Sequence, residues 1–317
     1  MSAHPLGRTA TRPTSIPVKG WWKILRRVYA RLVDENLTML SAGVAFFAML
    51  AIFPAMSAIV SLYALLADPA DIQQHLLSLQ QFLPDDVITI FGEQLTSLSQ
   101  DNGDSLGLTL FFSVLIAVWS AHRGVNALVR AVTVAYREKE SRSFIRLTAL
   151  TYFLTLGAIL LVVLTLSLML GIPAVLSLLP IPTWLIASGG LSGWLLFLAM
   201  STGSLALLYR FAPPRRSPKW RWLSPGALIG TFLWVTGSTA FSIYVSQFGT
   251  YNETYGTLSA IVVLLVWFYV TSLSVVMGAT LNAELEFQTL NDTTIGKDRA
   301  IGERDAYVAD HIPSQNG

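Results

Sequence analysis

The chain alternates long apolar stretches with shorter polar connections. Six stretches reach the ~20 residues that an α-helix needs to cross a hydrocarbon core about 30 Å thick. A lone spanning segment must satisfy its own backbone hydrogen bonds, which favours helices, and the ~10-residue alternating segments of a β-barrel are absent. The pattern predicts an all-α polytopic membrane protein, a six-transmembrane-helix bundle with spans over about 38–66, 106–128, 147–172, 184–208, 223–245 and 256–283.

Lysine and arginine occur in every second connection. They precede the first span, join spans two and three, join spans four and five, and follow the last span. None occurs in the connections 67–105, 173–183 and 246–255, and Arg123 is the one base inside a predicted span. Because cytoplasmic loops of membrane proteins carry the excess of Lys and Arg, this alternation predicts that the N- and C-termini are both cytoplasmic.

The two ends of the chain differ from the spans. Residues 1–18 contain three prolines and lack an apolar core, and residues 288–317 are polar. We therefore expect a disordered N-terminal tail, a membrane domain over 19–287 and a disordered cytoplasmic tail.

A basic amphipathic helix is predicted over residues 19–35. Trp21, Leu25, Val28 and Leu32 share one face at helical spacing, and lysine and arginine occupy much of the rest. Such a helix either lies in the membrane interface or packs against the cytoplasmic end of the bundle, and the sequence does not choose between these structural roles.

The connection 67–105 is acidic and carries two runs of apolar residues at helical spacing. It is too long for a featureless link in a compact protein, so we predict a helical outer loop of two short amphipathic helices. It serves either as a lid that attracts cations or, as we favour, as a solvated acidic loop.

Composition narrows the class of protein. Of the 317 residues, 53% are hydrophobic and 13% are charged, about half the charged share of an average soluble protein. The formal net charge is +2, and the basic clusters are explained by membrane topology, so no nucleic-acid partner is expected. The expected partners are membrane lipids, and a homo-oligomer is left open.

The residues expected of an enzyme are missing from the sequence. There is no cysteine, and the four histidines show no metal-ligand spacing. No Walker A sequence and no nucleophile elbow occurs. We therefore predict a protein that is not an enzyme, with no catalytic residue, no metal site and no cofactor.

Polar residues in or near the spans are the candidate contacts to a cavity or substrate. Ionisable groups there are costly and usually have a function. Arg123 and Asn126 lie in the second span, Arg210 follows the fourth, and Asn282 and Glu284 stand at the end of the sixth. Arg123 and Glu284 either form an ion pair facing an internal cavity or snorkel separately to the cytoplasmic interface.

Helix breaks and small residues give further candidates. Pro54 lies midway through the first span, where it is a candidate helix break, although a structural kink is the commoner role. The pairs Gly189/Gly193 and Gly226/Gly230 offer faces for close helix packing. The turn between spans five and six is either a tight anchored hairpin, which we favour, or an outer gate formed by Tyr251, Asn252, Glu253, Tyr255 and Gly256.

Several of these runs together resemble the YihY/virulence factor BrkB family, formerly labelled ribonuclease BN-like. The resemblance covers roughly residues 20–290 and rests on Ser41-Ala-Gly-Val-Ala-Phe-Phe, Phe53-Pro54, Ser120-Ala-His-Arg-Gly, Leu208-Tyr-Arg-Phe-Ala-Pro-Pro, Pro225-Gly226, 246–256, Trp267 and Gly278-Ala-Thr-Leu-Asn-Ala-Glu. Phe46-Phe47 stands where family members often have tyrosines. The resemblance implies a six-span protein of the bacterial inner membrane, with envelope or lipid-related transport as the expected role.

These observations lead to three functional hypotheses. The first is a transporter or export factor for a lipid or amphipathic anion, not driven by ATP itself, with Arg123, Arg210 and Glu284 at its cytoplasmic end and Pro54 as a flexing point. The second is a structural envelope scaffold without a transported substrate. A ribonuclease is the least favoured, since no metal-ligand cluster supports it.

Overall fold

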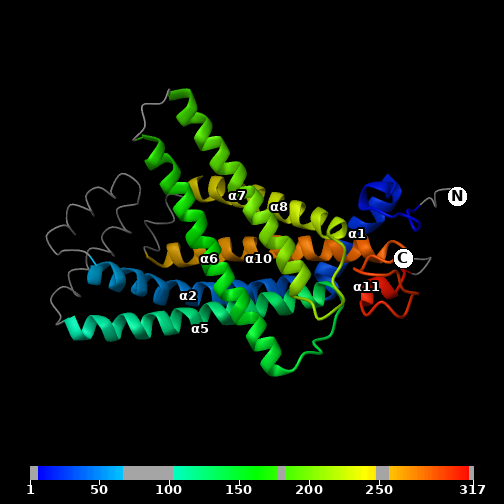
Figure 1. Cartoon of the computed structure of the whole chain (residues 1–317), viewed down its shortest axis with the longest axis horizontal. Helices are drawn as coiled ribbons and strands as arrows, with labels where there is room; N and C mark the ends of the chain where they lie inside the picture. Colours follow the sequence, from blue (N-terminus) through cyan, green and yellow to red (C-terminus); the bar gives the residue numbers. More distant parts are fainter. Residues whose placement is uncertain (1–5, 67–102, 178–182, 248–256, 314–317) are drawn as a thin grey trace. The chain divides into compact units, whose positions relative to one another are not determined.

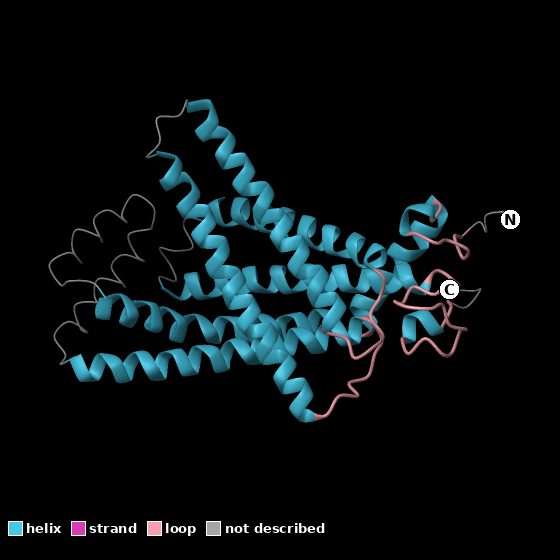
Figure 2. Ribbon diagram, viewed as in Figure 1, coloured by secondary structure: helices cyan, strands magenta, loops and turns pink. Residues whose placement is uncertain are grey.

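The computed structural model describes residues 6–66, 103–177, 183–247 and 257–313. Within these ranges no strand is assigned, which confirms the all-α prediction. The helices, drawn in Figures 1 and 2, are η1 (Pro13–Ser15), α1 (Val18–Asp34), α2 (Leu37–Leu66), α5 (Gly103–Ala135), α6 (Phe144–Ser177), α7 (Thr183–Phe211), α8 (Trp220–Gln247), α10 (Thr257–Phe287) and α11 (Tyr307–Asp310).

Six of these helices are long and apolar enough to span a membrane. Their apolar segments are Leu37–Ala58, Gly107–Ala135, Phe144–Thr165, Gly193–Phe211, Trp220–Ser246 and Ile261–Phe287, so the six predicted spans are confirmed as helices. Most of the helices run a few residues past the predicted ends, as α5 does to Ala135 and α6 does to Ser177. The predicted outer loop lies largely in residues 67–102, outside the described residues.

The chain divides into two compact units. One comprises residues 46–124, and the other comprises residues 1–45 together with 125–317. Both α2 and α5 contribute to each unit, since the division falls inside these two helices.

The unit 46–124 contains parts of α2 and α5. Ser57 Oγ and Ser113 Oγ lie 3.0 Å apart and share a hydrogen bond between the two helices. Gly124 packs beside Phe47 at ordinary van der Waals distance. Pro54 lies inside α2, which continues on both sides of it, so Pro54 does not end the helix. Its role as a flexing point stays a prediction.

The larger unit is centred on the close packing of α8 against α10. Gly226 and Gly278 face each other so closely that a Cβ on Gly278 would lie 2.5 Å from the carbonyl oxygen of Gly226. The hydroxyl of Tyr209 fills the space beside Gly278 and donates to Val275 O at 2.7 Å. The predicted small face of Gly226 and Gly230 is therefore a packing face. At Gly193, in contrast, an added Cβ would meet nothing within 4 Å.

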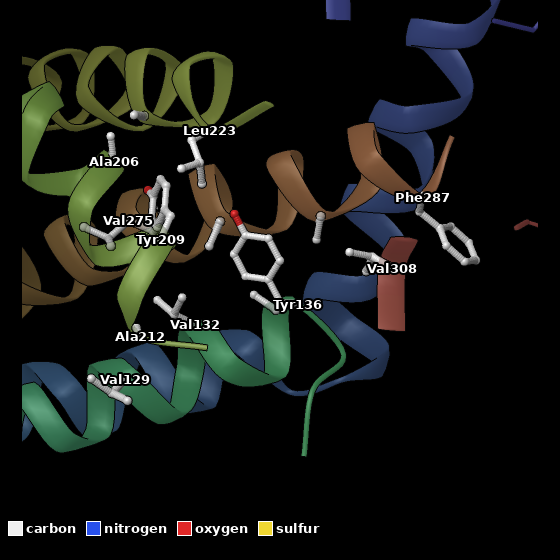
Figure 3. Packing of buried hydrophobic residues seen from close by; sticks show 14 of the residues in the cluster. Val129, Val132, Tyr136, Ala206, Tyr209, Ala212, Leu223, Val275, Phe287 and Val308 are labelled. Carbon is white, nitrogen blue, oxygen red and sulfur yellow. Dashed lines mark hydrogen bonds between the residues drawn. The ribbon is translucent and has the colours of Figure 1, made fainter. Parts of the chain in front are cut away.

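Apolar side chains from several helices fill the space around α10. Figure 3 shows part of this cluster, with Val132 and Tyr136 from the end of α5 and Ala206 and Tyr209 from α7. Farther along the spans, indole groups bind hydroxyls across the α8–α10 contact. Trp234 Nε1 donates to Thr271 at 3.1 Å, and Trp267 Nε1 donates to Ser238 at 3.2 Å. Such interhelical hydrogen bonds stabilise helix pairs in lipid.

The α1 helix packs against α10 through one face and exposes a second apolar face. The buried residues are Gly20, Ile24, Val28 and Arg31, whereas Leu25, which the sequence places on the same apolar face as Val28, is 49% exposed. The exposed apolar residues follow helical spacing: Val18, Trp22, Leu25, Tyr29 and Val33. The two roles that the sequence left open are therefore compatible, since a helix packed on the bundle still presents an apolar face for the membrane interface.

The predicted disordered tails differ from the structure. Residues 6–17 and 288–313, here called the terminal cap, are ordered and hydrogen-bonded to each other. Gln288 Nε2 donates to Leu6 O at 2.6 Å, and Thr289 Oγ1 donates to Ala10 O at 2.6 Å. Figure 2 shows the loops of these two segments close together. Low hydrophobicity suggested disorder, but the buried side chains of Gln288 and Thr289 bind backbone groups that are distant in sequence.

Candidate functional site

A cluster of paired charges lies where α10 ends. Glu284 is fully buried, and its carboxylate accepts from Arg27 Nε at 2.5 Å, Arg137 Nη2 at 2.8 Å and Arg31 Nη1 at 3.2 Å. We call Glu284, Glu286 and their arginines Arg27, Arg31, Arg137 and Arg215 the charge cluster. One carboxylate thus joins α1 and the α5–α6 connection to α10.

Arg31 also closes the end of α5. Its guanidinium donates to the carbonyl oxygens of Ala135 at 2.8 Å and Val134 at 3.2 Å, which lie in the last turn of α5, where the regular helical hydrogen bonds end. Glu35, one turn along α1, accepts from Arg31 at 2.6 Å. A cation at a helix C-terminus is favourable because the carbonyl ends carry partial negative charge. Arg31 therefore fixes α1 to α5 as well as to α10.

Arg137 adopts a left-handed backbone conformation, with φ of 59°. Its N–H donates to Val134 O at 2.8 Å, and the N–H of Glu138 donates to Thr133 O at 3.0 Å. This pair of bonds is the Schellman ending of a helix, in which glycine is the usual left-handed residue. The guanidinium lies 4.6 Å from the ring centre of Phe287 and reaches Glu284. An arginine at this left-handed position costs backbone strain, but it supplies the positive charge that binds Glu284, which a glycine could not do.

The second carboxylate of α10 binds the α7–α8 connection. Glu286 accepts from Arg215 Nη2 at 2.7 Å and from Thr293 Oγ1 at 2.6 Å, and the side chains of Arg215 and Glu286 are fully buried. Burial disfavours the charge on Arg215, but the neighbouring Glu286 and Tyr136 outweigh it and raise the pKa of Arg215 above its ordinary value. Arg215 therefore keeps its positive charge beside Glu286.

Further ion pairs attach the terminal cap to the same connection. Lys219 Nζ lies 2.9 Å from Asp298, and Arg216 lies 3.7 Å from Asp292. Burial acts to raise the pKa of Asp292, but the N–H groups of Thr294 and Arg299 donate to its carboxylate and the pKa is lowered overall. Four basic segments that are far apart in sequence thus meet at one end of this unit.

Two sequence candidates lie at this end of α10. Glu284 has the three arginine partners described above. Asn282 is fully buried, its Oδ1 accepts from Gly226 N at 2.7 Å and its Nδ2 donates to Leu223 O at 2.9 Å. Both ends of this amide bind the backbone of α8 near Pro225, so in this structure Asn282 holds α8 against α10.

Two candidates come from α5. Asn126 Oδ1 accepts from Arg130 Nε, one turn along the same helix, at 2.9 Å. Arg123 is exposed and belongs to the unit 46–124, where its guanidinium lies 5.6 Å from the ring centre of Phe47 and 5.7 Å from that of Trp119. Within the described residues, no carboxylate forms a salt bridge with Arg123. Its pairing with Glu284 stays a prediction.

Arg210 stands in the last turn of α7. Its guanidinium lies 4.5 Å from the ring centre of Trp220 and 6.0 Å from that of Phe211. The candidate gate residues Tyr251, Asn252, Glu253, Tyr255 and Gly256 lie outside the described residues. Across the described ranges, no group of three or more His, Asp or Glu side chains is placed to hold a metal ion.

Sequence reasoning missed the arginines of the charge cluster. It assigned Arg27, Arg31, Arg137 and Arg215 to membrane topology, whereas in the structure they bind buried carboxylates. The sequence did hold one signal for these ion pairs. Two acids lie half a turn apart at the end of the last span, on the same side of the membrane as the basic segments. Which base reaches which acid depends on tertiary packing.

The fold and this end of the bundle define a polytopic α-helical membrane protein with six membrane-spanning helices and an arginine-rich end. The sequence pattern of the virulence factor BrkB family matches residues 28–301, and the chain belongs to that family.

The relatives of this chain are named as membrane proteins or carry a ribonuclease-like name. The ribonuclease-like protein YfkH of Bacillus subtilis is 30% identical over 270 residues, which is 82% of this chain and 94% of the relative. A UPF0761 membrane protein of Pseudoalteromonas translucida is 25% identical over 86% of this chain and 88% of its own length. One from Xanthomonas campestris is 27% identical over 82% and 60%. No solved structure matches the chain.

Proposed function

We propose that this protein is a non-enzymatic transporter or export factor for a lipid or amphipathic anion in the bacterial inner membrane, with both termini in the cytoplasm. The observation that carries the proposal is Arg123, an exposed cation within the span Gly107–Ala135. Its described neighbours are the rings of Phe47 and Trp119. Ionisable residues in spans are costly, and an anionic group with an apolar tail matches a cation on an aromatic surface.

The grouping of basic segments supports the proposed orientation. The charge cluster and the terminal cap bring together α1, both basic connections and the chain end that follows α10. Positively charged segments of membrane proteins are retained on the cytoplasmic side. The absence of a nucleotide-binding sequence motif means that movement of the anion would be passive or driven by a gradient.

The test is transbilayer movement of a labelled anionic lipid in vesicles that contain the purified protein. We expect faster movement of head-labelled phosphatidylglycerol than in empty vesicles, and a several-fold lower rate for Arg123→Gln. Arg130→Gln is the matched control, because Arg130 is exposed on the same helix and binds Asn126. No acceleration by the wild-type protein, or equal losses in both variants, would reject the proposal.

A structural scaffold is the second candidate. It is favoured by the glycine contact between α8 and α10 and by the charge cluster, which rigidly joins the connections at one end. A scaffold predicts that Arg123→Gln leaves lipid movement unchanged, while disruption of the charge cluster impairs the protein's stability. The vesicle assay therefore separates the two candidates.

A further inference from the structure

The basic residues in and beside the α7–α8 connection fall into two groups, those that form a salt bridge with a described acid and those that do not. Arg215 binds Glu286, Arg216 lies beside Asp292, and Lys219 binds Asp298. Arg210 and Arg221 form no salt bridge with any described acid. These two residues flank the connection, one in the last turn of α7 and the other in the first turn of α8.

Arg210 has no hydrogen-bond acceptor among the described residues. Its side chain is half-buried, its Nη1 atom is shielded from solvent without a partner, and its guanidinium stacks on Trp220 at 4.5 Å from the ring centre. An arginine carries five N–H donors in a planar fork. The shielded Nη1 donor without a partner costs free energy, and an acceptor from outside the described residues would remove this cost.

The position of this group matches the headgroup region of a membrane. Arg210 is one residue from the end of the span Gly193–Phe211, and Trp220 is the first residue of the span Trp220–Ser246. The indole is 53% exposed. Tryptophan is enriched at the membrane–water interface, where phospholipid phosphates lie. Arg221, which is exposed and next to Trp220, adds a second positive charge.

We propose that Arg210 and Trp220 form a phosphate-binding site, with Arg221 as an auxiliary charge, whose ligand is the phosphate of a membrane phospholipid or free phosphate. The guanidinium fork matches two phosphate oxygens, and the indole holds the fork in place from one face. The site does not depend on transport, since a resident lipid would satisfy it equally.

The test is native mass spectrometry of the full chain in detergent, titrated with phosphatidylglycerol, with diacylglycerol as a lipid that lacks phosphate, and with inorganic phosphate. We expect Arg210→Gln to weaken phosphatidylglycerol binding about tenfold or more, as loss of a charge-assisted hydrogen bond would. The phosphatidylglycerol affinity of Arg210→Lys should lie between those of the wild type and Arg210→Gln, because lysine keeps the positive charge but lacks the planar guanidinium fork. Diacylglycerol binding should be unaffected.

Arg146→Gln is the matched control, because Arg146 is an exposed arginine near the start of α6 with no aromatic ring stacked on it among the described residues. Thermal stability of Arg210→Gln should stay near that of the wild type, since Arg210 makes no described hydrogen bond. If inorganic phosphate binds with the same dependence on Arg210 and the lipid does not, the ligand is free phosphate. Equal losses in both glutamine variants, or no loss in either, overturn the site whether or not the vesicle assay shows transport.

Discussion

Replacing Glu284 with glutamine keeps the side-chain shape and removes the negative charge that three arginines share. The carboxylate is fully buried, with nitrogen–oxygen distances of 2.5, 2.8 and 3.2 Å to its three partners. At an effective dielectric constant of about 20, one charge pair about 4 Å apart is worth roughly 4 kcal/mol before desolvation. Desolvation and repulsion among the arginines offset much of the attraction summed over the three pairs. Removing one partner of a buried ion pair typically costs about 3–5 kcal/mol.

We therefore expect Glu284→Gln to lower the free energy of unfolding by about 3–5 kcal/mol. The three arginines should not respond equally. Arg31 retains Glu35, and Arg27 retains Gln288 Oε1 at 2.7 Å, whereas Glu284 is the one acid that Arg137 reaches in the described chain. A double-mutant cycle should show the strongest coupling between Glu284 and Arg137, about 1–3 kcal/mol.

The measurement is equilibrium unfolding of the full chain in mixed detergent micelles, with each single and double variant at the same pH and salt. Glu140→Gln is the control, because the side chains of Glu140 and Arg142 are 28% and 18% exposed and such pairs contribute about 0–1 kcal/mol. A loss below about 1 kcal/mol for Glu284→Gln, or strict additivity with Arg137→Gln, would refute the role assigned to this carboxylate.

Three further outcomes test the surrounding structure. Arg137→Gly should be less destabilising than Arg137→Ala by about 1 kcal/mol in the same unfolding assay, because glycine relieves the left-handed backbone that alanine keeps; equal losses would contradict this. Gly278→Ala should lower the free energy of unfolding by about 1–3 kcal/mol, because the methyl group meets the α8 backbone. In contrast, Gly203→Ala should stabilise α7 by up to about 1 kcal/mol, because the added methyl group meets no described atom within 4 Å. Burial raises the pKa of Glu138 above its ordinary value of 4.5, so the folded chain binds the carboxyl proton more tightly than the unfolded chain. The contribution of Glu138 to stability therefore falls as pH rises above 4.5. Glu138→Gln should flatten a profile of melting temperature against pH in this range, and an unchanged profile would contradict the assignment.

The six spans could be predicted because their signal is local. Each apolar stretch is long enough to cross the bilayer by itself, and the helices found at α2 (Leu37–Leu66) and α8 (Trp220–Gln247) agree with the predicted 38–66 and 223–245 within a few residues. The glycine face of α8 was also readable, since Gly226 and Gly230 lie one turn apart. In contrast, Gly193 shows the same spacing with Gly189, but an added Cβ there would meet no described atom within 4 Å. Spacing alone does not say which face meets another helix.

The amphipathic helix shows where local pattern fails. The apolar residues of α1 form one broad face, and periodicity could not tell that the helix packs against α10 through one edge of this face. The structure buries Ile24 and Arg31 and exposes Trp22 and Leu25. A buried arginine is acceptable there because a carboxylate and helix-end carbonyls receive its donors, and these partners are not visible from the residues near it in sequence.

The sequence by itself determined the number of spans, the helical class and the segments in which the bases lie, because these follow from the free energy of apolar side chains in lipid and from charge retention. The tertiary structure decided which bases bind carboxylates within the described residues. Arg27 and Glu284 are 257 residues apart, and Arg210 forms no salt bridge with a described acid although Arg215 does. Those outcomes depend on how the helix ends pack, which no local pattern encodes.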